Sequence, residues 1–239
     1  MRNPLLPVTR AARALRRRFR GEPRERPLLD VPRVRLGSDY GGYAVCPEGL
    51  GAASVVYSFG IGEDLSFDLE LIARFGASVH GFDPTPRSIA WVRSQELPPE
   101  FTLHEYGLAA YDGVARFTPP DDPSFVSHTL VERAGAERPA VEVPVRRLAS
   151  VAAELGHARV DVLKMDVEGA EYDVIDDLLA NGPRPAQLLV EFHHHMPEIA
   201  LERTESAIDK LERAGYRVFH VSPSAHEFSF IRRPSRAAP

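Results

Sequence analysis

The sequence contains a single cysteine, Cys46, among its 239 residues. An internal disulfide is therefore excluded, and a reducing compartment is expected. The chain also has no apolar run that approaches the roughly 20 residues needed to span a bilayer. Its N-terminus lacks the apolar core of a secretory signal. Together these absences predict a cytoplasmic protein without a transmembrane segment.

Basic residues are scarce outside the N-terminus. The formal net charge is -5, yet residues 1–26 carry nine arginines against two glutamates, so the remainder of the chain is strongly acidic. An acidic body disfavours nucleic acid as a partner. The length and the 44% hydrophobic content suit one α/β domain with a substantial core. We therefore expect a basic, flexible N-terminal arm over residues 1–30 and a single domain over residues 31–239.

The arm contains a short amphipathic pattern over residues 8–20. Val8, Ala12, Leu15 and Phe19 share one face at helical spacing, and arginines occupy most of the rest. Such a helix would make weak contacts with an anionic membrane surface or with a partner protein. The alternative is a disordered basic arm, which the neighbouring prolines favour.

Strand and helix patterns alternate from residue 54 onward. Residues 54–59 have the pattern of a buried strand, residues 64–75 that of an amphipathic helix, and residues 77–82 that of a second strand. This order is a βαβ unit, which implies parallel strands joined by a right-handed crossover. Further strands are expected at residues 101–106, 160–165 and 187–192, and further helices at residues 86–95, 170–180 and 200–213.

The C-terminal part ends in two strand patterns, at residues 216–221 and 227–232, joined by a short turn. Such a pair is typical of a hairpin, which would add an antiparallel strand to the sheet. Residues 109–123 are rich in turn-forming residues and predict a loop or small hairpin that overhangs a site. The whole pattern predicts an α/β fold with a mostly parallel sheet and an antiparallel C-terminal hairpin strand.

The most informative stretch is residues 160–180, where a β-branched apolar run ends in Lys164, Asp166 and Glu168 and then becomes a helix. Polar groups at the carboxyl end of a parallel strand are typical of a site in an open α/β sheet. The alternative is that Asp166 and Glu168 only favour the positive end of the helix. Because a second strand ends in a glycine loop, we favour a ligand site.

That glycine loop contains Gly60 and Gly62, where glycine permits positive φ and close approach of a ligand. A full dinucleotide fingerprint would place a third glycine at position 65, which is Leu65, and this counts against NAD. Asp83 ends the next strand, where a carboxylate can accept the hydroxyl hydrogens of a ribose. The alternatives are a bare turn at the glycines and an Asp83 that starts a turn before Pro84.

Three consecutive histidines follow the strand at residues 187–192. If the strand continues, Glu191, His193 and His195 share one face and His194 lies on the other. We expect no metal here, because known sites rarely take three adjacent ligands, although a divalent metal on Asp166, Glu191 or His193 stays open. An exposed polar loop start is a further alternative. We favour His193 as a general base or a substrate hydrogen-bonding group, since histidine titrates near neutrality.

These residues carry a family likeness: the chain resembles the FkbM-like class I methyltransferases, which use S-adenosylmethionine (SAM). The matching segments, within residues 36–232, are YGGY at 40–43, YSFGIGEDLSFDLEL at 57–71, HGFDPTP at 80–86, VSHT at 126–129, LKMDVEGAEYDVI at 163–175 and VEFHHH at 190–195. The resemblance implies a Rossmann-like class I methyltransferase fold. It implies that the methionine part of SAM, the ribose and the adenine are held, respectively, by the glycine loop, by Asp83 and near the third strand. The implied cofactor-binding residues are Ser58, Gly60, Gly62, Asp83, Leu108 and Ala109.

The resemblance further implies O-methylation of a hydroxyl on a small molecule such as a sugar or a specialised metabolite. We expect His193 to accept the proton, with Asp166 and Glu168 orienting the acceptor or Lys164, so these four are the candidate catalytic residues. His128, in the VSHT segment, is the reserve candidate for the base. Two rival functions remain: a SAM-fold binding or scaffold protein without turnover, and a nucleotide-dependent oxidoreductase.

Overall fold

The computed structural model describes residues 17–117 and 141–233. The predicted amphipathic segment at residues 8–20 lies mostly outside this range, and His128 with its VSHT segment lies wholly outside it. Among the described residues, none of the helices combines the length and the apolar character that a membrane crossing requires.

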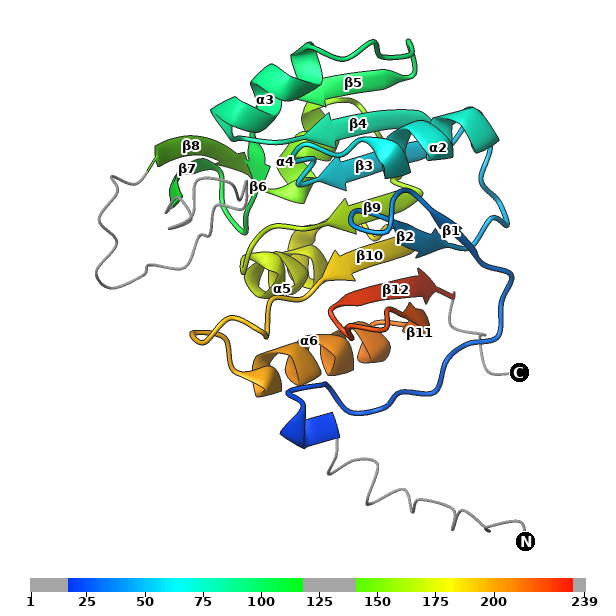
Figure 1. The fold of residues 1–239 in the computed structure, drawn as a ribbon, viewed down its shortest axis with the longest axis vertical. Coiled ribbons are helices and arrows are strands. Elements are labelled where there is room, and N and C mark those ends of the chain that lie inside the picture. Colours follow the sequence, from blue (N-terminus) through cyan, green and yellow to red (C-terminus); the bar gives the residue numbers. More distant parts are fainter. Residues whose placement is uncertain (1–16, 118–140, 234–239) are drawn as a thin grey trace, which may run out of the picture.

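A seven-stranded sheet forms the centre of the fold, in the order β11-β12-β10-β9-β3-β4-β5 (Figure 1). Its strands are β3 (Val55–Phe59), β4 (Ser78–Phe82), β5 (Phe101–His104), β9 (Val162–Met165), β10 (Gln187–Glu191), β11 (Tyr216–Val221) and β12 (Glu227–Arg232). The pairs among β5, β4, β3, β9 and β10 are parallel, whereas β12 runs antiparallel to both of its neighbours. The predicted Rossmann-like class I fold with an antiparallel C-terminal strand is confirmed.

Helices cover both faces of this sheet, and alternate residues of its strands point to opposite sides. The helices are α2 (Ser66–Phe75), α3 (Pro86–Arg93), α4 (Leu148–Glu154), α5 (Glu171–Asn181) and α6 (Leu201–Arg213). Val56 and Val162 belong to the core on the side of α2 and α3. Tyr57 and Leu163 belong to the core on the side of α4, α5 and α6. Burial on both faces explains why these strands appear in the sequence as unbroken apolar runs.

Two smaller strand groups were not predicted in full. β1 (Val34–Leu36) and β2 (Tyr43–Val45) form an antiparallel pair beside the main sheet. β6 (Gly107–Leu108), β7 (Gly113–Phe117) and β8 (Val141–Arg146) form a three-stranded sheet in the order β6-β8-β7. The turn-rich segment predicted as a loop or small hairpin thus contains β7, and its antiparallel partner is β8.

A histidine cluster lies between the sheet and the end of α4. His80 Nδ1 is 3.0 Å from His104 Nε2, the rings of His80 and His157 are 4.9 Å apart, and His157 Nδ1 is 2.7 Å from the hydroxyl of Tyr57. Burial, followed by the charges of His104 and His157, lowers the pKa of His80 to about 4. Protonating this cluster would therefore oppose folding.

We expect acid to destabilise the protein through this cluster. Below about pH 6.5, its unfolded-state pKa, His80 binds a proton in the unfolded chain, whereas in the folded protein it binds one only near pH 4. The free energy of unfolding therefore falls as the pH drops from about 6.5 to about 4. After allowance for screening of a half-buried group, the loss is of order 1 kcal/mol. Thermal melts between pH 7.5 and pH 4.5 should show a shallower decline of Tm in His80→Gln than in the wild type. Parallel declines would contradict the assignment.

The described part of the predicted N-terminal arm lies along α6 (Figure 1). Arg24 pairs with Glu205 and Asp209, and Arg26 pairs with Asp209 and Glu212. The backbone N–H of Leu29 donates to the carbonyl of Val218 at 2.7 Å. Residues 24–29 are therefore held against the domain by charge and by the backbone.

Arg26 should contribute more to stability than Arg24. The Arg26 side chain is 10% exposed and its Nη1 lies 2.6 Å from Asp209 and 2.9 Å from Glu212, whereas the Arg24 side chain is 58% exposed. We expect Arg26→Ala to cost about 1–2 kcal/mol and the matched Arg24→Ala variant about 0.5 kcal/mol. Urea unfolding of both variants tests this, and equal losses would contradict it.

Candidate functional site

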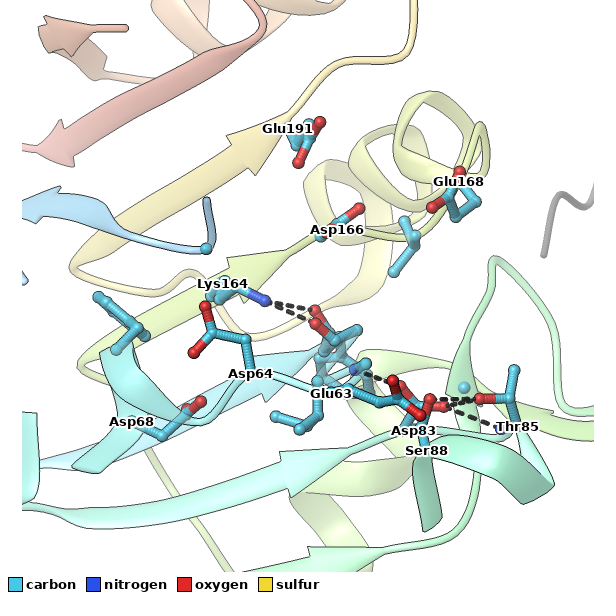
Figure 2. Close-up of a pocket in the computed structure, with 18 of the residues that line it drawn as sticks. Glu63, Asp64, Asp68, Asp83, Thr85, Ser88, Lys164, Asp166, Glu168 and Glu191 are labelled. Atoms are coloured by element: carbon cyan, nitrogen blue, oxygen red, sulfur yellow. Dashed lines mark hydrogen bonds between the residues drawn. The ribbon is translucent and has the colours of Figure 1, made fainter. Parts of the chain in front are cut away.

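A cavity of about 640 Å³ opens at the carboxyl ends of β3, β4, β9 and β10 (Figure 2). Its size and its position in an open α/β sheet are those of a ligand site. The described residues that line it include nine with carboxylates and one basic side chain, Lys164. The cavity therefore favours a cationic ligand over a phosphate-rich one.

The glycine loop after β3 forms one wall of the cavity. Gly60 and Gly62 have φ of 78° and 58°. A Cβ on Gly60 would lie 2.0 Å from the carbonyl oxygen of Asp166, whereas a Cβ on Gly62 would have nothing within 4 Å. Gly60 therefore lets the loop touch the end of β9, and Gly62 faces open space.

Asp83, at the end of β4, fixes this loop. Its side chain is 4% exposed, and Oδ2 accepts the backbone N–H of Gly62 at 2.9 Å. Oδ1 accepts both the backbone N–H of Thr85 at 2.8 Å and its hydroxyl at 2.6 Å. Each carboxylate oxygen has about two lone pairs, so Oδ2 keeps one that no described residue engages.

Lys164 lies beside the glycine loop and is buried (Figure 2). Its ammonium donates to the carbonyl of Gly60 at 2.7 Å and lies 3.3 Å from that of Phe59. It also lies 5.5 Å from the ring centre of Tyr43, within cation–π range. Lys164 therefore contacts the glycine loop directly and lies apart from the cluster of Asp166, Glu168 and His193.

Two acidic residues of this wall were not predicted as site residues. Asp64 accepts from the hydroxyl of Ser38 and from the backbone N–H of Ser66. Asp68 on α2 is 1% exposed, and burial raises its pKa to about 6. The charge of Lys164 and the neighbouring hydroxyl of Ser58 act in the opposite direction and lower this pKa. A buried carboxylate on a helix that lines a cavity is a candidate ligand contact.

His193 lies just after β10, beside Asp166 and Glu168, and is not itself among the described residues that line the cavity. Its ring is 3% exposed, and Nε2 lies 3.5 Å from an oxygen of Asp166 and 3.5 Å from an oxygen of Glu168. Its Nδ1 lies 3.3 Å from Oε1 of Glu171, which also accepts the backbone N–H of His193 at 2.9 Å. Because an ionised carboxylate only accepts, Nδ1 carries a proton and donates it to Glu171. The structure brings the predicted residues Asp166, Glu168 and His193 together and adds Glu171, for which the sequence suggested no role.

The charges of this cluster reinforce one another. Burial alone would lower the pKa of His193, but the hydrogen bond and charge of Glu171, followed by Asp166 and Glu168, raise it to about 10. Burial and the charge of Asp166 raise the pKa of Glu191 to about 8. With no cation at the cluster, His193 is therefore protonated at neutral pH.

A family model, described as the methyltransferase FkbM domain, matches residues 55–218, more than half of the chain. The chain belongs to the FkbM methyltransferase family. The matched range contains every residue for which the sequence predicted a catalytic or cofactor-binding role. The predicted family membership is confirmed.

Individual relatives of this FkbM-family chain are distant. Probable methyltransferase-like protein 24 of Rattus norvegicus is 31% identical over 177 residues, which are 70% of this chain and 42% of that protein. The chain thus spans less than half the length of this relative. The FkbM methyltransferase of Methylobacillus flagellatus KT is 14% identical, with a TM-score of 0.46, over 76% of this chain and 44% of that one. Aeropyrum pernix fibrillarin, in complex with natively bound SAM, is 13% identical, with a TM-score of 0.39, over 76% and 66%.

Of the remaining predicted cofactor-binding residues of the FkbM-family domain, only some lie at the cavity. Leu108 lines the cavity. Ala109 packs with Ala115 and Phe117 in the core of the small sheet. Ser58 is fully buried in β3, and its hydroxyl neighbours the carboxylate of Asp68. Neither Ala109 nor Ser58 is among the residues that line the cavity.

The FkbM-family chain also has cavity residues for which the sequence had suggested no role. Tyr40 is 87% exposed at the rim, and Phe117 and Glu227 reach the cavity from β7 and β12. The YGGY segment signalled the first of these, because it was part of the family likeness. Phe117 and Glu227 depend on packing between distant segments, and no local pattern marks them.

Proposed function

We propose that the chain is a SAM-dependent methyltransferase that methylates a hydroxyl group of a small molecule such as a sugar or a specialised metabolite. The observation that carries this proposal is the buried Asp83 carboxylate, which keeps one lone pair beside the glycine loop at the wall of the cavity. A nucleoside ribose offers a hydroxyl donor suited to that position. Membership of the methyltransferase family supports the same conclusion.

The charge of the cavity supports SAM over a dinucleotide. SAM carries a sulfonium and an ammonium, whereas a dinucleotide carries a pyrophosphate that nine carboxylate-bearing residues would repel. Asp83 and Leu108 would hold the nucleoside, and the glycine loop with Asp64 and Asp68 would hold the methionine part. Asp68 supplies a buried carboxylate at the cavity wall. When bound, SAM supplies a methyl group that is activated for displacement.

The protein's remaining task is to orient the acceptor and remove its proton. Asp166 and Glu168 line the cavity, and His193 Nε2 lies 3.5 Å from an oxygen of each, which supports their predicted roles towards the acceptor. Lys164 acts as a positioning residue, because it holds the carbonyl of Gly60 in place. His193 can accept a proton only after its own Nε2 proton has been displaced.

Calorimetric titration with SAM and with its demethylated product, S-adenosylhomocysteine, tests the proposal. We expect micromolar binding of both compounds and no response to NAD. Transfer of labelled methyl groups from SAM is then measured on a panel of sugars and other hydroxylated metabolites. Absence of binding to both sulfur ligands would overturn the proposal.

The same experiments address the rival functions. SAM binding without transfer to any acceptor would favour the binding or scaffold protein, and NAD binding would favour the oxidoreductase. The cytoplasmic location is likewise a proposal, which the single cysteine supports.

A further inference from the structure

We propose that Asp166, Glu168 and His193 bind a divalent metal ion at the part of the cavity wall that Asp166 and Glu168 form. Ion binding itself stands on geometry alone, whereas the role of the ion in methyl transfer rests on the proposed function. The sequence predicted no metal at the three adjacent histidines and left open a divalent metal on Asp166, Glu191 or His193. The structure brings together Asp166, Glu168 and His193, which follow two different strands, β9 and β10.

The positions of the three side chains bring one ligand atom of each together. These atoms lie within 4.8 Å of one another, and the two distances from His193 Nε2 are both 3.5 Å. Ligands that each lie about 2.1 Å from a shared ion are about 3.0–3.5 Å apart when their bonds are at octahedral to tetrahedral angles. Both distances from His193 reach the tetrahedral end of that range, and the carboxylates of Asp166 and Glu168 approach each other by up to about 1–2 Å to share the ion.

Glu171 supplies the support that metal-binding histidines usually have. It is fully buried, and its Oε1 receives both the ring Nδ1–H and the backbone N–H of His193. Its Oε2 accepts the backbone N–H of Gly169 at 2.9 Å. This arrangement fixes the ring and directs Nε2 towards Asp166 and Glu168, as carboxylates behind metal-binding histidines do.

The groups around these three side chains also favour a bound cation. Oδ1 of Asp166 is shielded from solvent and has no hydrogen-bond partner among the described residues. Glu227 lines the same cavity and adds negative charge, and Glu191 lines it as a further carboxyl group. One imidazole and two carboxylates suit Mn²⁺ or Zn²⁺, and three protein ligands leave positions open for water or for the acceptor.

An acceptor hydroxyl in such an open position would lose its proton more readily, because a divalent cation lowers the pKa of a bound oxygen. The ion would also take the place of the proton on His193 Nε2, so His193 would then be a metal ligand and not the base, and the hydroxyl proton would pass to water or to a carboxylate that lines the cavity. The site would therefore favour acceptors that present a hydroxyl oxygen as a metal ligand.

Mn²⁺ binding to metal-stripped protein, followed by electron paramagnetic resonance, tests the proposal. We expect one micromolar site per chain, with a nitrogen coupling from His193. Glu168→Gln and His193→Gln should each weaken binding at least tenfold, and His193→Gln should abolish the nitrogen coupling. The matched control is Glu105→Gln, because Glu105 is an exposed carboxylate paired with Arg93 and does not line the cavity.

Far-ultraviolet circular dichroism establishes whether each variant is folded. If His193→Gln is unfolded, the Mn²⁺ affinity of Glu168→Gln alone decides the test. Absence of a site up to millimolar Mn²⁺ and Zn²⁺, or equal affinity in the wild type and in the folded variants, would overturn the proposal. SAM binding without Mn²⁺ binding contradicts the metal site alone. Mn²⁺ binding without SAM binding supports the metal site and contradicts the proposed function alone.

Discussion

Replacing Asp83 with alanine is expected to weaken SAM binding at least 100-fold, which corresponds to about 2.7 kcal/mol. The substitution removes the proposed acceptor of a ribose hydroxyl. It also leaves three protein donors, the N–H of Gly62 and the N–H and hydroxyl of Thr85, without their partner. Hydrogen bonds to a charged group contribute about 1.5–3 kcal/mol each, so both losses act in the same direction. Calorimetric titration of wild type and variant measures the change.

The control for this experiment is Glu63→Gln. Glu63 also lines the cavity, but it is paired with Arg87 through a 2.7 Å contact at the half-exposed rim. We expect its affinity for SAM to change less than about threefold, as for an exposed ion pair. Unchanged SAM affinity in Asp83→Ala would contradict the assignment of Asp83 to the ribose. An equal loss of SAM affinity in both variants would indicate that the overall negative charge of the cavity, and not a specific hydrogen bond, determines binding.

Substituting Gly60 by alanine should destabilise the fold by about 2–5 kcal/mol. A φ of 78° is costly for a residue with a Cβ, at about 1–2 kcal/mol. The new Cβ would also lie 2.0 Å from the carbonyl oxygen of Asp166, so the end of β9 must shift, at a cost of about 1–3 kcal/mol. Urea unfolding followed by circular dichroism gives the difference in free energy of unfolding.

Gly62→Ala is the matched control for this effect. Its φ of 58° carries similar backbone strain, but a Cβ there meets no atom within 4 Å. We therefore expect a loss of only about 1–2 kcal/mol. If both variants lose the same stability, contact between the glycine loop and β9 is not what requires glycine at position 60.

The sequence predicted the central sheet well, because its strands are buried on both faces and appear as continuous apolar runs. It did not predict β1 and β2, which are three residues each, or β8, which contains Pro144. Short strands carry too few alternations to form a pattern, and a proline argues against a strand unless the strand lies at an edge. The small sheet was therefore seen only as turn-rich sequence.

For the site, strand ends were predictable and buried acids were not. Asp83, Asp166 and His193 follow strands, and the carboxyl ends of parallel strands meet at one edge of the sheet. Glu171 and Asp68 occupy the first turns of α5 and α2, where acidic residues normally favour the helix dipole in solvent. Only the packing of both helices shows that these two side chains are buried and face the site.

The pairing of β3 with β9 has a consequence for the order of folding. Phe59 lies opposite Met165, and the bond from Lys164 to the carbonyl of Gly60 spans 104 positions of the chain. Closing a loop of this length has a large entropic cost, which slows folding. No shorter segment of the chain contains both the glycine loop and the end of β9. Local helices and the β3–β4 unit can form early. A ligand that spans the cavity can bind only after β3 and β9 have paired. Newly made chains therefore remain inactive until that pairing forms.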